Sequence, residues 1–484
     1  MIDIEFLLNK AIKLHKRGKI DKAEEIYKKI VNVDPDNIIS LNNLVSILNS
    51  KENYEKSLDL INRALKIRPD YLDALNNKGN CLKGLSRYDD AIAYYKKALE
   101  IKPDFVGALN NLANSYRLVG RNTEAIPIFE KVIELKPDYY EALYNQAICL
   151  YSLNLFDEAK DSYVQAIKVK PDFVEAYYNL SLLQMLQGDY KEGIKNYEWR
   201  KKRNKSKKNP KFDNETEWLG DKDIKNKIIY ISKEQGLGDY IQYCRYLLLL
   251  KNLGTTILLD TPKILRPMID TMKIDCIYFD DIKKVKFDYH CSIVSLALAF
   301  NTTLETIPAK EPYFFTPKNI KDDWEKKLNK FKRLNIGLKW TGNSSYIDDE
   351  HRSTTLKELK PLFDLPYDFH SLEIEYSKKD EALLNNITNL KCHKKDIMGL
   401  DNTAGLIENL DLVISVNTSV AHLTGALGKK LWVLLPSVPE YRWLLNRQDS
   451  PWYPKTKIYR QSLEGDWKTM INKVKEDLKL LKKI

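Results

Sequence analysis

One stretch of the chain decides the architecture of the first 200 residues. Residues 69–102 read PDYLDALNNKGNCLKGLSRYDDAIAYYKKALEIK, and the Pro-Asp pair that opens them returns every 34 residues. The prolines of these pairs are Pro35, Pro69, Pro103, Pro137 and Pro171. A strict period in this range is typical of a solenoid built from stacked supersecondary units.

Two further sets of positions keep the same period. Small residues stand at Ala23, Ser57, Ala91, Ala125, Ala159 and Gly193. Large residues follow four places later, at Tyr27, Ile61, Tyr95, Phe129, Tyr163 and Tyr197. Closely packed helices need a small residue where their axes approach, and a large residue one turn later fills the neighbouring groove. Each proline then stands just past a second helix, which it cannot continue. The pattern resembles the tetratricopeptide repeat, with six copies over about residues 4–200.

An asparagine ladder shares this period. Its members are Asn9, Asn43, Asn77, Asn111, Asn145 and Asn179. Asn is a mediocre helix former, so its return in six helix interiors needs a reason. Each Asn falls on the first helix of its pair, and in the repeat that the chain resembles these helices line the concave face. An amide offers a donor and an acceptor, which together match a peptide backbone.

The ladder resembles the one in the repeats of protein O-GlcNAc transferases. That resemblance implies an extended acceptor chain gripped along the groove. The alternative is that duplication copied a solvated or helix-to-helix Asn six times.

Composition excludes several classes of protein. The 484 residues are 43% hydrophobic and 30% charged, so the chain is not disordered. The start has no basic and apolar signal pattern, and no apolar run approaches the roughly 20 residues that span a bilayer. Six cysteines without a C-x-x-C pair indicate reduced core residues in a cytoplasmic protein. The six scattered histidines suggest no metal site. The net charge of +11 permits a phosphate-bearing partner without requiring one.

A basic run from Arg200 to Lys208 marks the junction after the repeats. It has no interleaved aromatic residues that would stack on bases. We therefore expect a solvated helix end, within a linker over residues 201–222, rather than a nucleic-acid site.

The C-terminal half reads as α/β structure. Apolar runs at 228–231 and 255–259 bracket the loop Gly236-Leu237-Gly238-Asp239 and a helical pattern to Leu250. Residues 277–279 and 288–296 are strand or helix candidates, and further strands are expected within 336–340, 367–372, 411–415 and 430–435. They predict two Rossmann-like lobes, at 223–318 and 319–484. The loop lacks the third glycine of a dinucleotide fingerprint, which argues against an NAD site.

A strand-to-helix turn at residues 414–428 predicts a phosphate site. Free N–H groups at a helix start cradle phosphate, with the Thr418 and Ser419 hydroxyls beside them. His422 lies one turn later on the same face, in reach of a diphosphate. An ordinary N-cap at Thr418 or Ser419 is compatible with this interpretation.

Six short motifs follow one another along the C-terminal half of the chain. They are Glu234–Asp239, Gly337–Asn343, Asp349–Ser353, Asn417–Gly428, Tyr441–Leu445 and Asp449–Pro454. Residues 222–480 resemble the heptosyltransferase-like family of GT-B glycosyltransferases, in particular its bacterial branch with tetratricopeptide repeats in front. The resemblance implies a sugar nucleotide held mainly by the C-terminal lobe, inversion of the anomeric centre, and neither metal nor resident cofactor.

The resemblance also implies roles for single residues. Asp239 matches the family's general base, although a carboxylate in a first helical turn is also favoured by the helix dipole. On the donor side it points to Lys339, Arg352, Glu375, Asn417, Thr418, Ser419 and His422. Arg352, in preference to Lys339, would neutralise the departing diphosphate, and Glu375 would lie near the ribose. Asn417 stands where the family commonly has Asp, which keeps the hydrogen bonding and drops the charge.

Two acidic clusters and four aromatic residues of the C-terminal half are expected to have structural rather than catalytic roles. The acidic clusters Asp348-Asp349-Glu350 and Asp280-Asp281 are expected in solvated loops. Four aromatic residues either line the cleft or pack: Trp340, Tyr441, Trp443 and Trp452.

The sequence thus predicts a glycosyltransferase that moves a sugar to an acceptor hydroxyl, with Ser or Thr of a protein held by the repeats as one acceptor. A lipopolysaccharide or surface-glycan precursor is a second acceptor class. The remaining alternative is a non-catalytic interaction scaffold with a decayed glycosyltransferase fold.

Overall fold

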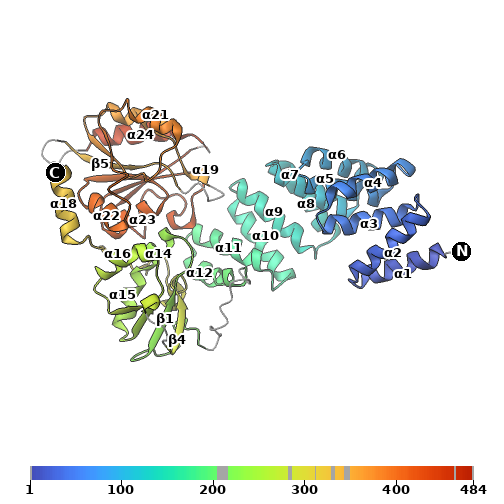
Figure 1. The fold of residues 1–484 in the computed structure, drawn as a ribbon, viewed down its shortest axis with the longest axis horizontal. Helices are drawn as coiled ribbons and strands as arrows, with labels where there is room; N and C mark the ends of the chain where they lie inside the picture. Colours follow the sequence, from blue (N-terminus) through green and yellow to red (C-terminus); the bar gives the residue numbers. More distant parts are fainter. Residues whose placement is uncertain are drawn as a thin grey trace. The chain divides into compact units, whose positions relative to one another are not determined.

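The computed structural model describes residues 3–203, 216–281, 286–310, 312–328, 333–342, 349–462 and 465–481. Internal contacts divide the chain into two compact units, Met1–Leu180 (unit 1) and Ser181–Ile484 (unit 2). The described part of unit 1 is helical throughout, whereas unit 2 contains two sheets flanked by helices (Figure 1).

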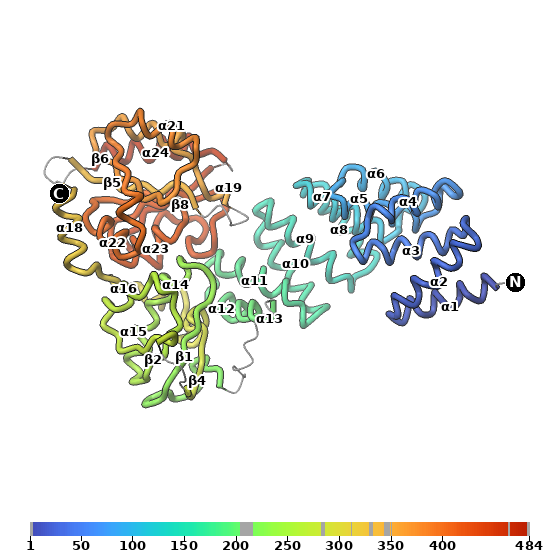
Figure 2. Tube along the Cα trace, viewed as in Figure 1, coloured from blue at the N-terminus to red at the C-terminus, as the bar shows by residue number. Residues whose placement is uncertain are grey.

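Unit 1 is an array of antiparallel helix pairs, which the trace in Figure 2 follows one after another. The first helices of the pairs have 13 residues each: α1 (Ile4–Lys16), α3 (Ile38–Ser50), α5 (Leu72–Gly84), α7 (Val106–Leu118), α9 (Tyr140–Ser152) and α11 (Val174–Leu186), the last of which crosses into unit 2. The second helices have 14: α2 (Ile20–Val33), α4 (Tyr54–Ile67), α6 (Tyr88–Ile101), α8 (Asn122–Leu135) and α10 (Phe156–Val169). The predicted helical solenoid over the N-terminal part is therefore confirmed.

The turn within each pair also repeats. One residue with positive φ follows each first helix, at Gly18, Glu52, Ser86, Gly120, Asn154 and Gly188. Three of these six are not glycine, although the left-handed region is costly for residues with a Cβ. The repeat therefore imposes the turn even where local preference opposes it.

The core of the array follows the two packing ladders. Ala23, Ala91, Ala125 and Ala159 are fully buried, as is Ser57. The large residues one turn later are buried too, in the order Tyr27, Ile61, Tyr95, Phe129 and Tyr163. The predicted packing of small and large positions is thus confirmed, and the hydroxyl of Ser57 is accommodated because it donates to Asn53 O at 3.0 Å.

Unit 2 contains two parallel sheets. The smaller sheet has the order β3-β2-β1-β4, from β1 (Ile228–Ser232), β2 (Thr256–Leu259), β3 (Cys276–Tyr278) and β4 (Tyr289–Ser292). The larger has the order β10-β9-β8-β5-β6-β7, from β5 (Asn335–Lys339), β6 (Asp368–Ser371), β7 (Leu390–Cys392), β8 (Leu412–Val416), β9 (Leu431–Leu435) and β10 (Thr456–Arg460). The strand pairs of both sheets run parallel.

The larger sheet is the main core of unit 2. Every residue of β8 and β9 is buried, as expected of parallel strands that are covered on both faces. The sequence did not predict β7 and β10, because each has only a short or mixed apolar pattern. These parallel sheets with covering helices confirm an α/β architecture for the C-terminal part.

The end of the helical array is built into unit 2. Trp452 Nε1 donates to the Tyr190 hydroxyl at 2.9 Å, and Leu445 N donates to Leu186 O at 3.2 Å. Tyr190 belongs to the short helix α12 (Tyr190–Tyr197), which is followed by α13 (Arg200–Arg203). Residues from 181 onward therefore share a core with the sheets rather than with the earlier repeats.

The six cysteines are free, and four are buried, whereas Cys392 is exposed, contrary to the prediction that all pack in the core. Within the described ranges, no helix is both long and apolar enough to cross a bilayer. In the same ranges, no cluster of three or more His, Cys, Asp and Glu side chains is arranged to hold a metal.

Candidate functional site

The candidate site lies where the strand order of each sheet reverses. In the larger sheet β5 runs beside both β6 and β8, and in the smaller sheet β1 runs beside both β2 and β4. Such switch points open a crevice beyond the carboxyl ends of the strands, where parallel sheets bind ligands. The loop after β1 leads to Asp239, and the loop after β8 leads to Thr418. Lys339 at the end of β5 is in register with Ser415 of β8.

The two switch points are joined by two helices. α14 (Leu237–Tyr243) follows β1 and packs against α23 (Ser419–Ala426), which follows β8. A Cβ on Gly238 would lie 2.8 Å from His422 Cδ2 and 3.6 Å from Ser419 Cα. Only glycine therefore lets these helix starts approach so closely.

The Asp239 carboxylate is bound by one residue that follows the smaller sheet's β1 and by one residue that follows the larger sheet's β9. Its Oδ2 accepts from Gly236 N at 3.2 Å, which is the first-turn capping role anticipated for it. Its Oδ1 accepts from Arg442 Nη2, and Arg442 Nη1 also donates to Glu440. The Asp239 side chain is 17% exposed and that of Arg442 9%, so this ion pair is largely shielded from water. The carboxylate thus points to the other sheet rather than to bulk solvent.

The segment that carries Arg442 is strained. Arg442 lies in the 3-10 turn η5 (Tyr441–Trp443), and Leu444 directly after it has φ 54°. That region is unusual for a bulky residue and costs on the order of 1–3 kcal/mol. Arg460 holds the turn in place by donating to Leu444 O at 2.6 Å and to Trp443 O at 3.1 Å.

The start of α23 matches the predicted phosphate cradle only in part. Thr418 is the N-cap residue, but its side chain makes no capping bond, and its hydroxyl lies 3.2 Å from the Ser415 hydroxyl. Thr418 and Ser419 are half-buried, at the mouth of the loop. The first N–H groups of the helix are therefore left without an Oγ cap, which suits an anion at this position.

His422 occupies a different setting from the one anticipated. It is 4% exposed, its Nδ1 lies 2.9 Å from the Tyr453 hydroxyl, and its ring stacks on Trp443. Burial lowers the pKa of His422 to about 3, with nearby Arg245 acting in the same direction. The imidazole is therefore neutral near pH 7, and its packing against Gly238 makes it first a contact between the two helices.

Lys339 is committed to a carboxylate that the sequence analysis did not name. Its Nζ pairs with Glu373, which is 1% exposed. Glu373 also accepts from Trp340 N and Thr341 N, each at 2.8 Å. The pair therefore fixes the loop after β5, so the predicted contact of Lys339 with a diphosphate would require it to leave a buried partner.

Arg352 and Glu375 lie on loops of the same sheet. Arg352 Nε donates to Asp349 Oδ1 at 2.9 Å, and Asp349 Oδ2 accepts from the Ser353 hydroxyl at 3.0 Å. Asp349 is thus a partner of α19 (Asp349–Arg352) rather than a solvated acid, while Asp348 lies outside the described residues. Glu375 is exposed, two residues beyond Glu373.

Asn417 and the predicted cleft aromatics belong to the packed interior. Asn417 Oδ1 accepts from Trp443 Nε1 at 3.0 Å, and Asn417 is 4% exposed. An amide oxygen serves this bond without the cost of burying a charge, which explains Asn at a position where the resemblance leads one to expect Asp. Trp340, Tyr441 and Trp452 are likewise buried, so packing describes them better than a cleft lining.

Two other polar clusters differ from expectation. Asp280 and Asp281 are exposed, yet both pair with Arg266, at 3.2 and 2.9 Å. The prediction of a solvated helix end is wrong for Arg200, which is 4% exposed. Arg200 binds both Glu234 oxygens at 2.8 Å and Glu198 at 2.6 Å. It thus joins the end of the helical array to the residue that precedes the glycine loop.

The asparagine ladder of unit 1 lies on first helices that contact one another, as α3 does α5, α5 does α7, and α7 does α9. Three of its amides donate to a residue 35 places earlier, on the preceding first helix: Asn77 to Asn42 (2.8 Å), Asn111 to Asn76 (3.0 Å) and Asn179 to Tyr144 (3.1 Å). Asn9 is exposed, whereas Asn43 and Asn145 are half-buried. Helix-to-helix bonding therefore accounts for three rungs.

Sequence reasoning missed Arg442, Glu373 and Tyr453. Arg442 stood in a quoted motif, but nothing in the sequence pairs it with Asp239, 203 positions away. Glu373 and Tyr453 carry no periodic signal, because their partners come from other strands and helices.

Comparison with known families identifies the repeats. Models described as tetratricopeptide repeat match residues 4–37, 39–71, 72–105, 94–126, 116–180 and 174–198. The N-terminal part therefore carries tetratricopeptide repeats, as its 34-residue period predicted. The chain is also 22% identical over 282 residues to Protein FlbA of Caulobacter vibrioides, which is 53% of this chain and 47% of FlbA. It thus spans about half the length of this curated relative.

Several solved structures are similar to the chain. The crystal structure of MamA is 22% identical, with 33% of this chain and 96% of MamA covered and a TM-score of 0.31. YrrB, described as a TPR protein with an unusual peptide-binding site, is 19% identical, with 36% and 89% covered and a TM-score of 0.31. The pilF protein of Pseudomonas aeruginosa is 18% identical, with 41% and 90% covered and a TM-score of 0.38.

Proposed function

We propose that the chain is an inverting glycosyltransferase of GT-B architecture, which moves a sugar from a nucleotide-diphosphate sugar to an acceptor hydroxyl without a metal. One observation carries the proposal. The loop with the proposed base Asp239 and the helix start at Thr418 come from the switch points of two parallel sheets, and α14 and α23 hold them together. A reaction between two substrates needs such a pair of facing sites.

The proposed chemistry divides between the two switch points. The diphosphate lies at the start of α23, where backbone N–H groups and the helix dipole offset its charge. Asp239 accepts the proton of the acceptor hydroxyl as oxygen attacks the anomeric carbon from the face opposite the departing diphosphate. Arg442 acts as a positioning residue that aims the Asp239 carboxylate.

The residues proposed to bind the donor differ in how their side chains are placed. Arg352 remains the proposed basic contact for the leaving group, and Glu375, which is exposed, remains the proposed contact for a ribose. Lys339 and His422 do not touch the diphosphate directly in this proposal, because each is held by an internal partner in the interior. Arg352 also has an internal partner, Asp349, but its side chain is 18% exposed and bonds to Asp349 through Nε. Asn417 supports the turn through Trp443.

We further propose that the repeats bind the acceptor, a protein whose Ser or Thr receives the sugar. The amide oxygen of Asn77 remains on offer after its donor is used between helices, whereas that of Asn111 accepts from Lys83 Nζ at 3.3 Å. A peptide-binding site is described for YrrB, which is one of the similar repeat proteins. With a surface-glycan precursor as acceptor, the repeats would instead bind partner enzymes, and no protein would become glycosylated.

A non-catalytic scaffold is the second candidate, and one observation favours it. Four predicted donor contacts, Lys339, Arg352, Asn417 and His422, all have partners inside the protein. A fold that had lost its substrate would keep such packing while losing affinity for nucleotides.

Calorimetry with a panel of nucleoside diphosphates separates the two candidates. The transferase predicts binding that Ser419→Asp abolishes, because a carboxylate at the helix start repels the diphosphate. Absence of binding by every nucleotide would instead support the scaffold.

Intact-mass analysis of co-expressed proteins with sugar nucleotides then identifies the acceptor. Asp239→Asn should abolish transfer while sparing nucleotide binding. Asp401→Asn, in the first turn of α22 (Leu400–Glu408), is the matched control and should leave transfer unchanged. Full transfer by Asp239→Asn would overturn the proposed mechanism. Replacing Asn77, Asn111 and Asn145 by Ala should weaken a peptide acceptor and spare donor hydrolysis.

A further inference from the structure

The first repeat exposes a face that the later repeats bury. Phe6 on α1 is 63% exposed. The equivalent positions at 34-residue intervals are fully buried small residues: Ser40, Ala74, Ala108, Ala142 and Ala176. Phe6 is therefore both the largest residue of this series and the exposed one.

The burial of the later positions has a clear cause. Ala74 shares a core cluster with Ile61 and Ala64 of α4, the second helix of the preceding repeat. Ala142 likewise lies with Val132 of α8. No helix among the described residues covers the corresponding face of α1. This face therefore resembles the packing surface between two repeats, with no helix packed against it. Solenoids normally end in a polar outer surface for this reason.

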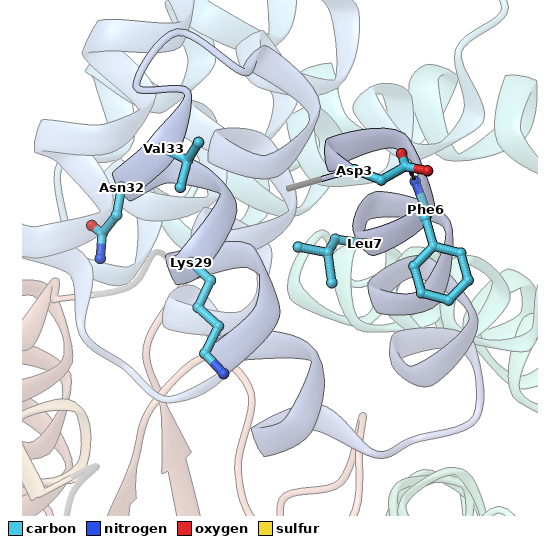
Figure 3. A pocket seen from close by; sticks show the side chains of 6 residues that line it. All are labelled: Asp3, Phe6, Leu7, Lys29, Asn32 and Val33. Atoms are coloured by element: carbon cyan, nitrogen blue, oxygen red, sulfur yellow. Dashed lines mark hydrogen bonds between the residues drawn. The ribbon is translucent and has the colours of Figure 1, made fainter. Parts of the chain in front are cut away.

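A cavity of about 490 Å³ opens on this face. Figure 3 shows its lining, with Leu7 pointing from α1 toward the α2 side and Phe6 at the outer edge. Val33 of α2 closes the other side; it is 52% exposed, and its equivalents Ile67, Ile101, Leu135 and Val169 are exposed as well, so the feature peculiar to the first repeat is Phe6. The centre of the face is therefore apolar, with Phe6 as a protruding ring and a groove between Leu7 and Val33.

The rim of the cavity carries one charge of each sign, on different helices. Asp3 precedes α1, and Lys29 lies on α2. Asp3 accepts from Phe6 N at 3.0 Å, and the structure shows no ion pair between Asp3 and Lys29 within the described chain. A two-fold axis exchanges equivalent surfaces, so each charge would meet its opposite across a symmetric interface. The rim of the face is thus complementary to itself in charge.

We propose that a second copy of this chain covers this face, joining two arrays through their first repeats. Phe6 of each copy enters the groove between Leu7 and Val33 of the other, and Asp3 faces the partner's Lys29. This end-to-end dimer supplies to each α1 the helical cover that α3, α5, α7 and α9 receive from the repeat before them. It is independent of the proposed transferase activity and leaves the sheets of unit 2 untouched.

Sedimentation equilibrium of the full chain tests the proposal, with a concentration-dependent dimer as the expected result. Phe6→Asp should raise the dimer dissociation constant at least tenfold, because a charge enters the apolar centre. Val164→Asp is the matched control, since Val164 on α10 is 47% exposed and lies away from this face. The Val164→Asp variant should dimerise like the parent chain.

Charge variants show whether a loss of the dimer comes from the interface rather than from misfolding of the variant. Lys29→Glu, at an exposed position, should weaken the dimer by placing two acids together, and adding Asp3→Asn should restore part of the affinity while keeping the helix cap. A chain that stays monomeric at all concentrations would overturn the proposal. So would a dimer indifferent to Phe6→Asp and Lys29→Glu, or a face occupied by an unrelated protein in place of the second copy.

Discussion

The repeats and the α/β unit use buried polar groups in opposite ways. In the repeats, a bond such as Asn77 to Asn42 joins equivalent helices and recurs one period later as Asn111 to Asn76. In the α/β unit, Asp239 and Arg442 meet once, from segments 203 residues apart. A lost bond in the periodic array leaves its copies in place, whereas a lost pair in the α/β unit has no substitute. The four predictions below test that difference, from the largest expected effect to the smallest.

The largest effect is expected at Arg200. Arg200→Met removes the buried cation from the partly buried Glu198 and Glu234. Among the described residues only Glu198 keeps a second basic partner, Lys201, so the free energy of unfolding of unit 2 should fall by about 3 kcal/mol. Arg121→Met, which breaks an exposed pair with Glu124 in the repeats, is the control and should cause no resolved change. Urea unfolding followed by far-ultraviolet circular dichroism measures both, because the eight tryptophans all lie in unit 2 and would not report on the repeats. Equal effects of the two substitutions would contradict the comparison.

A methyl group at Gly238 should also be costly. Gly238→Ala pushes a Cβ to within 2.8 Å of the His422 ring, and the cost of such overpacking is roughly 1–3 kcal/mol. Gly107→Ala in the repeats meets Phe105 at 3.5 Å, an ordinary contact, and should be neutral or stabilising because Ala favours helix. Thermal unfolding of both variants provides the measurement. A stable Gly238→Ala protein would mean that α14 and α23 are not held tightly together.

Acid should weaken the α/β unit through its histidines. Burial lowers the pKa of His422 and of His370 to about 3 from the usual 6.5. Between these values the unfolded chain binds protons that the folded chain does not, so stability is complete above pH 6.5 and is lost as the pH falls toward 3. Each histidine contributes a slope of up to about 1.4 kcal/mol per pH unit. Unfolding titrations from about pH 7 to about pH 4 should show His422→Gln flattening this dependence, and an unchanged slope would exclude His422 as a source.

The smallest effect is expected within the asparagine ladder. Asn77→Ala removes one bond between first helices and should cost about 0.5–1.5 kcal/mol. Asn145→Ala, at a rung for which no bond to the preceding helix is seen among the described residues, should cost less. Differential scanning calorimetry compares the two variants. If Asn145→Ala proved the more damaging, helix-to-helix bonding would not explain the ladder.

The two regions also differ in how far their sequence predicted them. The 34-residue period placed the helices of unit 1, their buried small and large positions and the proline ends, because every repeat packs against a copy of itself. It did not reveal that Asn77 bonds to Asn42, since that contact joins neighbouring repeats at an offset of 35 residues. In unit 2 the apolar runs located most strands, but β7 and β10 had too few apolar residues to stand out.

The sequence suggested single residues for the candidate site, but it did not reveal their hydrogen-bond and ion-pair partners. Asp239, Thr418 and His422 were predicted from motifs and from the family resemblance, and the structure shows that α14 and α23, which begin beside them, are in contact. The partners of these motifs were invisible to sequence reasoning, because an ion pair such as Asp239 with Arg442 has no spacing rule. For the same reason Lys339 was assigned to a ligand when Glu373 already holds it.

The sequence by itself determined the helical repeat, its buried small and large positions, and the α/β character of the part that follows, because these depend on local spacing and periodic burial. Tertiary structure alone decided which charges are buried and paired, that Gly238 is required by His422, and that Phe6 lies exposed where its equivalents are buried. These features depend on what lies across a contact. Only the folded chain brings such distant segments within a few ångströms of one another.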